Sequence, residues 1–244
     1  MKNAPNSLSH SLDEYELTKA KNIIDQFVYS CYHTMRGPLK SISGLVYLMK
    51  NTAPNDTQNN VLYLESIEKT VNKMENLLTG LEQFITNSKK KLSTRAIHVE
   101  NTVTEILDDF ADVIRENHID VTVNVRQSIP FHNDSTQFAM ILSHLISNAI
   151  MFQDDDKSKH RIRIEAEIKP KRLHLKIADN GIGINAKILP DIFLLFFRGT
   201  EKSKGSGVGL YIVNETIKAL GGKVSLKSRL RYGSTFSIAI PNLG

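Results

Sequence analysis

The first third of the chain carries apolar residues at the alternating three- and four-residue spacing of a heptad repeat. One run begins at Ile24 and a second at Leu64, with turn-forming residues 52–56 between them. The positions are Ile24, Val28, Cys31, Met35, Pro38, Ile42, Leu45 and Met49 in the first run, and Leu64, Ile67, Val71, Met74, Leu78, Leu81 and Ile85 in the second. The pattern predicts a hairpin of two long helices.

Two helices with such narrow apolar stripes bury little surface by themselves. Pairing two hairpins into a four-helix bundle would complete their core, so the pattern predicts a homodimer through this hairpin. The alternative is a hairpin that packs on the rest of its own chain.

Beyond a polar segment at 87–91, interpreted as a linker, helix and strand patterns alternate. Helical patterns lie at about 100–116, 134–152 and 207–220, and strand patterns at 119–125, 162–168, 173–177, 224–226 and 236–240. The predicted fold class is α+β. A helical dimerisation domain over 1–90 precedes an α/β sandwich over 91–244, with its helices on one face of the sheet.

Composition narrows the classes of protein. No apolar run approaches the roughly 18 residues that span a bilayer, and no signal peptide is evident, so we expect a soluble, cytoplasmic chain. Membrane association would require a segment absent here. The single cysteine, Cys31, excludes an intramolecular disulfide. The net charge of +5 is scattered along strand faces, and no nucleic-acid-binding motif is present, so we expect no nucleic-acid partner.

Two glycine-rich segments are candidates for ligand contact. Asp179, Gly181 and Gly183 directly follow a predicted strand, where glycines let backbone approach a flat ligand and the carboxylate can accept from an amine. The second segment opens a helix, whose free N–H groups suit phosphate. Its candidates, with the basic residues upstream, are Arg198, Lys202, Lys204, Gly205, Gly207, Gly209 and Leu210. The alternatives are a strand-ending turn and a flexible loop.

Two more polar residues stand out on predicted helices. Asn148 lies in an apolar stretch, where a Mg²⁺–phosphate group would satisfy its amide, although a structural asparagine satisfied by the protein is the alternative. His33 is two residues from the nearest seam positions and should therefore face solvent. Arg36 and Pro38 follow it, and proline tends to kink a helix. The candidate catalytic residues of this segment are His33, Thr34 and Arg36.

The order of these motifs resembles the sensor histidine kinases, with their H, N, G1, F and G2 boxes. In chain order they are His33, Asn148, Asp179-Gly181-Gly183, Phe196-Phe197-Arg198 and Gly205-Gly207-Gly209, followed by a last motif at Gly233-Ser234-Thr235-Phe236. The resemblance runs from about residue 23 to residue 241. It implies a dimerisation and phosphotransfer hairpin joined to an ATP-binding domain of GHKL (Bergerat) type.

The resemblance also implies roles. Asp179 would recognise the adenine amine, Gly181 and Gly183 would line the base pocket, and Asn148 would hold Mg²⁺. The glycines of the second segment would shape a lid over the phosphates of ATP. His33 would attack the γ-phosphate, and the phosphoryl group would pass to an aspartate in the receiver domain of a response regulator.

Four residues depart from the family's pattern. Thr34 replaces the acidic neighbour of the phosphorylated histidine, and Gly37 stands where relatives carry a residue used in dephosphorylation. His144 replaces the first asparagine of the N box, and Met151 replaces a basic residue. These departures keep open a degenerate dimeric scaffold or phosphotransfer intermediate. A GHKL ATPase related to chaperones or DNA-repair proteins is a further alternative, but it would need a general-base glutamate on the Asn148 helix, where His144 stands instead.

Overall fold

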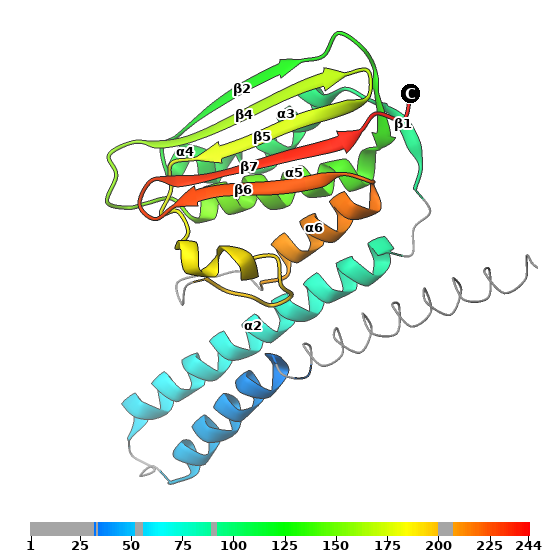
Figure 1. The fold of residues 1–244 in the computed structure, drawn as a ribbon. Helices are drawn as coiled ribbons and strands as arrows, with labels where there is room; N and C mark the ends of the chain where they lie inside the picture. The colour runs from blue at the N-terminus through cyan, green and yellow to red at the C-terminus, as the bar shows by residue number, and fades with distance from the viewer. Residues whose placement is uncertain (1–31, 33, 52–55, 89–91, 200–206) are drawn as a thin grey trace, which may run out of the picture. The chain divides into compact units, whose positions relative to one another are not determined.

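The computed structural model describes residues 32, 34–51, 56–88, 92–199 and 207–244. The chain divides into two compact units, 1–78 and 79–244, each of which is described by itself (Figure 1). The expected boundary between functional domains at residue 90 stays a prediction.

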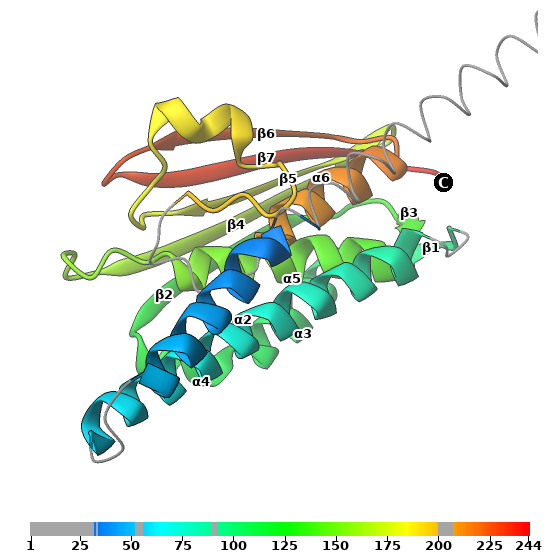
Figure 2. The ribbon, with the colours of Figure 1, turned by 90° about the horizontal axis from the view of Figure 1, so that it is seen from below.

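Unit 1 contains two helices, the helical residues 34–51 and most of α2 (Thr57–Ser88), side by side in Figures 1 and 2. Asp56 begins α2, because its carboxylate accepts from the backbone N–H of Asn59 at 3.3 Å and its carbonyl accepts from that of Asn60 at 3.2 Å. Since α2 continues to Ser88, the start of the expected linker is helical. No helix among the described residues has the length and apolarity needed to cross a bilayer.

The seam within this hairpin differs between its helices. Every described seam position of the first helix is half-buried, as predicted: Met35, Pro38, Ile42, Leu45 and Met49. In α2, the half-buried side chains fall at residues 60, 63, 67, 70 and 74. Only 67 and 74 belong to the predicted seam, whereas Leu64, Val71 and Leu78 are 54%, 40% and 51% exposed in the single chain.

Unit 2 is built on a five-stranded sheet. Its strands, in spatial order, are β2 (Ile119–Arg126), β4 (His160–Lys169), β5 (Arg172–Asp179), β7 (Gly233–Pro241) and β6 (Lys223–Arg229). β2 and β4 are parallel and the other neighbours antiparallel. A small second sheet pairs β1 (Thr94–Ile97) with β3 (Phe131–Asp134). Buried and exposed residues alternate along β4 and β5, so one sheet face carries the core.

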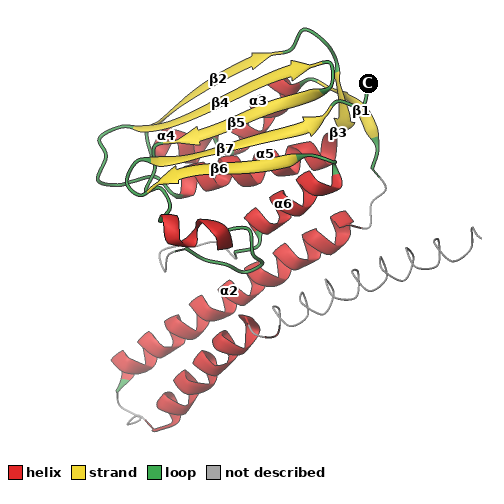
Figure 3. Ribbon diagram, viewed as in Figure 1, coloured by secondary structure: helices red, strands yellow, loops and turns green. Residues whose placement is uncertain are grey.

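The helices of unit 2 cover that face. They are α3 (Val99–Asp109), α4 (Ala111–Glu116), α5 (Ser135–Met151) and α6 (Gly209–Ala219), with a 3-10 turn, η1 (Ala186–Asp191), between β5 and α6 (Figures 2 and 3). Phe138, Leu142 and Leu145 of α5 are buried in one cluster with Ile164 and Leu175 of the sheet. Unit 2 is therefore the predicted α/β sandwich with helices on one face.

The sequence pattern does not predict three of the observed elements, and it predicts two separate helices as one. The helix predicted at 100–116 is interrupted at Phe110, which separates α3 from α4. β1 and β3 are four residues each and pair only with one another, so neither is long enough to show a periodic signal. The turn η1 contains Pro190 and no buried residue, and it was not predicted.

Candidate functional site

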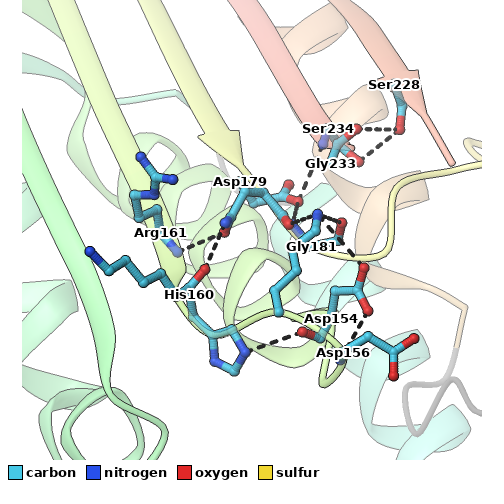
Figure 4. Close-up of polar contacts among 12 residues, drawn as sticks. Asp154, Asp156, His160, Arg161, Asp179, Gly181, Ser228, Gly233 and Ser234 are labelled. Carbon is cyan, nitrogen blue, oxygen red and sulfur yellow. Dashed lines mark hydrogen bonds and ion pairs between the residues drawn. The ribbon is translucent and has the colours of Figure 1, made fainter. Parts of the chain in front are cut away.

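Asp179, the last residue of β5, is the centre of the candidate site. Its Oδ1 accepts a hydrogen bond from the backbone N–H of Gly181 at 2.9 Å and another from that of Ser234 at 3.2 Å (Figure 4). Ser234 belongs to the last motif, on β7, which pairs with β5. The fold thus brings the G1 motif and the last motif, more than fifty residues apart in sequence, onto one carboxylate.

Opposing effects act on this carboxylate, and burial is the largest of them. Burial raises the pKa of Asp179 above its ordinary value of 3.8, because a charged carboxylate loses hydration there. The hydrogen bonds from Gly181 and Ser234 and the positive charge of Lys157 oppose that rise and lower the pKa. The site therefore holds an acceptor whose charge depends on its immediate neighbours.

The glycines after Asp179 let the chain pack against backbone. A Cβ on Gly181 would lie 2.1 Å from the carbonyl oxygen of Phe152, at the end of α5. Gly183 has φ +65°, and a Cβ there would lie 2.0 Å from the carbonyl oxygen of Arg229 on β6. The N–H of Ile182 donates to the Phe152 carbonyl at 3.0 Å, which ties this loop to α5. Both glycines are therefore required by packing, whatever role each has toward a ligand.

Helix α5 carries the candidate metal residue. Asn148 is half-buried in its last turn, and His144 lies one turn earlier on the same side. Among the described residues, no three His, Cys, Asp or Glu side chains gather as a metal site. An amide oxygen such as that of Asn148 still fits Mg²⁺, because Mg²⁺ takes few protein ligands and fills its shell with water and phosphate oxygens.

The second glycine segment begins α6 beside His144. A Cβ on Gly209 would lie 3.4 Å from Nδ1 of the His144 ring, so the N-terminus of α6 packs against α5 at this point. Burial lowers the pKa of His144 below its ordinary value of 6.5 and keeps the ring neutral. Leu210, the next candidate, packs against the core in the first turn of α6.

The F motif meets the same segment. The N–H of Phe196 donates to the carbonyl of Gly207 at 2.9 Å, and both residues have positive φ, at +64° and +74°. Arg198, two residues on, is half-buried. Lys202, Lys204 and Gly205 lie outside the described residues, as does His33.

The two remaining predicted site residues belong to unit 1. Thr34 is half-buried and Arg36 is exposed, both on the helical residues 34–51. Within unit 2, Asp179, Gly181 and Gly183 form one cluster. Asn148 lies on the neighbouring α5, and Gly207 and Gly209 lead into α6.

Two contributors to the cluster were not identified from sequence. The Ser228 hydroxyl accepts from the N–H of Ile184 at 2.8 Å and contacts the Ser234 hydroxyl at 2.9 Å. Lys157, on the loop before β4, donates to the carbonyl of Gly181 at 3.2 Å. A strand serine and a loop lysine carry no local signal, because only tertiary contact gives them partners.

Comparisons with known proteins concern the fold and family of the chain. Residues 133–243 match the family model described as histidine kinase-, DNA gyrase B-, and HSP90-like ATPase. The chain is 29% identical over 230 residues to the autoinducer 2 sensor kinase/phosphatase LuxQ of Vibrio vulnificus, covering 88% of this chain and 26% of LuxQ. The chain spans between about a quarter and a half of the length of the curated relatives it matches.

Solved structures share the fold. Histidine kinase ThkA, in a crystal structure with the response regulator protein TrrA, superposes with a TM-score of 0.69 at 20% identity, covering 99% of this chain and 68% of ThkA. Full-length ShkA in complex with AMPPNP gives a TM-score of 0.60 at 22% identity, covering 86% of this chain and 44% of ShkA.

The matched fold and the motifs it brings together define residues 133–243 as a domain of the GHKL ATPase class. The curated relatives that it matches include sensor kinases and histidine-protein kinases, so the resemblance seen in the order of the motifs is confirmed.

Proposed function

We propose that the chain is the dimerisation, phosphotransfer and catalytic part of a sensor histidine kinase. It binds Mg²⁺–ATP in unit 2, phosphorylates His33, and passes the phosphoryl group to an aspartate in the receiver domain of a response regulator. The observation that carries the proposal is the half-buried carboxylate of Asp179, fixed by the N–H groups of Gly181 and Ser234 inside a GHKL-type domain.

ATP recognition follows from the chemistry of that carboxylate. An ionised carboxylate only accepts hydrogen bonds, so it suits the exocyclic amine of adenine. The phosphates would lie toward the N-terminus of α6, where free N–H groups and the helix dipole favour anions. The amide oxygen of Asn148 would hold Mg²⁺, which neutralises phosphate charge during transfer. The solved structure of ShkA with AMPPNP, a protein of the same fold, supports this assignment.

Dimerisation through the hairpin is supported by its exposed apolar residues. In the first helix Tyr32, Leu39 and Val46 are exposed at seven-residue intervals. In α2, Leu64, Val71, Leu78 and Ile85 are exposed at the same interval. A seven-residue repeat of exposed apolar side chains is the pattern that a coiled-coil or bundle partner covers. A second copy of the chain supplies the matching surface.

The transfer requires little covalent assistance from the protein. A ring nitrogen of His33 attacks the γ-phosphorus, the bond between the γ-phosphorus and the bridging oxygen breaks, ADP leaves, and the ring loses a proton to solvent. A histidine in water has a pKa of about 6.5, so its ring is mostly neutral and nucleophilic at pH 7. The phosphoryl group then passes from nitrogen to a carboxylate oxygen of the partner. The complex of ThkA with the response regulator TrrA supports this class of partner.

The test is autophosphorylation with γ-labelled ATP and Mg²⁺. Wild type should acquire acid-labile label, and His33→Gln should acquire none. His98→Gln, which replaces an exposed histidine of unit 2, is the matched control and should label like wild type. Label that persists in His33→Gln would contradict the assignment of the phosphorylated residue.

A degenerate scaffold or phosphotransfer intermediate is the second candidate function. Three residues favour it: Thr34 cannot act as a base near neutral pH, Met151 lacks a charge, and His144 presents a half-buried imidazole with a lowered pKa beside Gly209. Imidazole is a poor ligand for Mg²⁺ compared with oxygen. Nucleotide binding without label on His33 would establish this function in place of the kinase.

A further inference from the structure

The loop between α5 and β4 closes on the G1 segment through one lysine. The ammonium group of Lys157 donates to the carbonyl of Asn180 and, at 3.2 Å, to the carbonyl of Gly181. It also pairs with Asp154, with 3.7 Å between Nζ and Oδ2. The side chains of Lys157 and Asp154 are only 27% and 12% exposed, so these contacts are poorly screened by water.

Hydrogen bonds within the loop between α5 and β4 hold Lys157 in place. The backbone N–H of Lys157 donates to the carbonyl of Asp154 at 2.9 Å, and the N–H of Asp156 lies 3.3 Å from the Asp154 carboxylate. Nε2 of His160 contacts the Asp154 carbonyl at 3.2 Å (Figure 4). These bonds fix a loop that otherwise has no regular secondary structure.

The segment whose carbonyls accept from Lys157 is also held by hydrogen bonds. The side chain of Asn180 accepts from the N–H of Arg161 at 2.7 Å and donates to the carbonyl of Lys159 at 2.8 Å. Asp179 and Gly181 flank this residue, so hydrogen bonds connect the lysine, the carbonyls that it binds and the candidate base-binding carboxylate.

Lys157 is also the charged neighbour that acts on Asp179. Of the other ionisable groups near this end of the sheet, Asp154 is paired with Lys157, and the Arg229 guanidinium stacks on the Tyr232 ring at 4.0 Å. His160 contacts the carbonyls of Asp154 and Asn117. Burial raises the pKa of Asp179, and the backbone hydrogen bonds from Gly181 and Ser234 are the larger effects that oppose this rise. The charge of Lys157 opposes it as well, to a smaller extent.

We infer that Lys157 is a positioning residue for base recognition. It holds the segment after Asp179 in place through the carbonyls of Asn180 and Gly181 and sets a positive charge beside the site, so that the site selects a base with an amine over one with a carbonyl. The inference rests on the proposed nucleotide site. An ionised carboxylate accepts from the C6 amine of adenine but repels the C6 carbonyl of hypoxanthine. A protonated carboxyl can donate to that carbonyl, so losing the Lys157 charge weakens the discrimination.

The experiment measures the affinities for ADP and IDP by calorimetry at pH 6.0, 7.5 and 8.5. Lys157→Gln removes the charge and keeps a donor for the carbonyls, whereas Lys157→Met removes both. Lys159→Met, which changes an exposed lysine of the same loop, is the matched control. We expect Lys157→Gln to lose roughly threefold to tenfold in ADP affinity at pH 6.0, about the effect of one partly screened charge pair, and less at pH 8.5.

The preference for ADP over IDP should fall together with the ADP affinity in Lys157→Gln and should stay at the wild-type level in Lys159→Met. Equal losses for both nucleotides at every pH would mean a purely structural lysine and would overturn the inference, as would a wild-type profile in Lys157→Gln. Lys157→Arg keeps the charge, so its ADP and IDP affinities across pH should match those of wild type. If they instead matched those of Lys157→Gln, the inference would also be overturned. If wild type bound no ADP at any pH, the proposed nucleotide site itself would fail.

Discussion

The two units of the chain differ in how completely they bury their apolar residues. In unit 2, Phe131, Phe138 and Leu142 have no exposed surface, and the helices pack on one face of the sheet. In unit 1, Tyr32, Leu64 and Leu78 are more than half exposed. The α/β unit is therefore completed by its own chain, whereas the hairpin presents apolar surface that a second surface would cover.

Geometry explains the difference. A sheet is covered when several helices pack across it, and the order of elements in unit 2 supplies them. Two paired helices bury only the stripe where they meet, and residues a half-turn away on each helix remain exposed. The following predictions test this contrast, from the largest expected effect to the smallest.

The core of unit 2 should tolerate truncation least. Leu142→Ala removes three carbon atoms from a fully buried site on α5 and should lower the free energy of unfolding by about 2–5 kcal/mol. Leu194→Ala, at a residue that is exposed, is the control and should change it by less than about 0.5 kcal/mol. Urea denaturation measures both. Equal effects would show that the described core does not carry the stability of unit 2.

A charge in the exposed stripe of the hairpin should dissociate the proposed dimer. Val71→Glu would bury an unpaired carboxylate against the second copy, at a cost of about 3 kcal/mol or more, which raises the dimer Kd over 100-fold. Lys69→Glu introduces the same side chain about 200° away around α2 and should leave the dimer intact. Sedimentation analysis distinguishes the two. If the wild-type protein were monomeric, the proposed homodimer would be wrong.

The same variant sharpens the contrast between units. Because unit 2 is completed by its own chain, ADP binding to Val71→Glu should match that of wild type even when the dimer is lost. An ADP affinity that falls together with the dimer would mean that the nucleotide site depends on the hairpin's association.

Asp179→Asn should cost about 1.5–3 kcal/mol of nucleotide binding, the range for a hydrogen bond to a charged group. Binding needs the carboxylate, and burial raises its pKa, so wild-type affinity should decline on acidification at a higher pH than for an ordinary aspartate. The asparagine variant should lack that decline. Calorimetry across pH checks both expectations. If Asp179→Asn bound nucleotide as tightly as wild type, Asp179 would not be part of the base site.

The smallest effect concerns His144. Its pKa in the folded state is lowered below 6.5, so as pH falls through 6.5 the unfolded chain takes up the proton first and stability is lost. His144→Asn should reduce the loss of unfolding free energy between pH 7.5 and pH 5.5 by about 1 kcal/mol or less. The measurement is the drop in Tm between these two pH values, which should be smaller in the variant. The exposed His174→Asn is the control and should leave the drop as in wild type.

The sequence by itself determined much of unit 2. α5, α6 and the strands of the larger sheet were predictable because alternation and helical periodicity are local properties that tertiary packing left unchanged. Asp179 and the glycines after it were identifiable because a strand end followed by glycines is a short-range signal. The order of the motifs added the resemblance to sensor histidine kinases, which the comparisons confirm.

Only the tertiary structure decided which residues share the site. The meeting of Asp179 with Ser234, the packing of Gly209 on His144, and the contact of Lys157 with Gly181 join segments far apart in sequence. Likewise, the heptad spacing did not separate Ile67, half-buried in the hairpin, from Leu64 and Val71, which remain exposed. Periodicity assigns a residue to a face of its own element, but the neighbour that this face meets depends on how the whole chain folds.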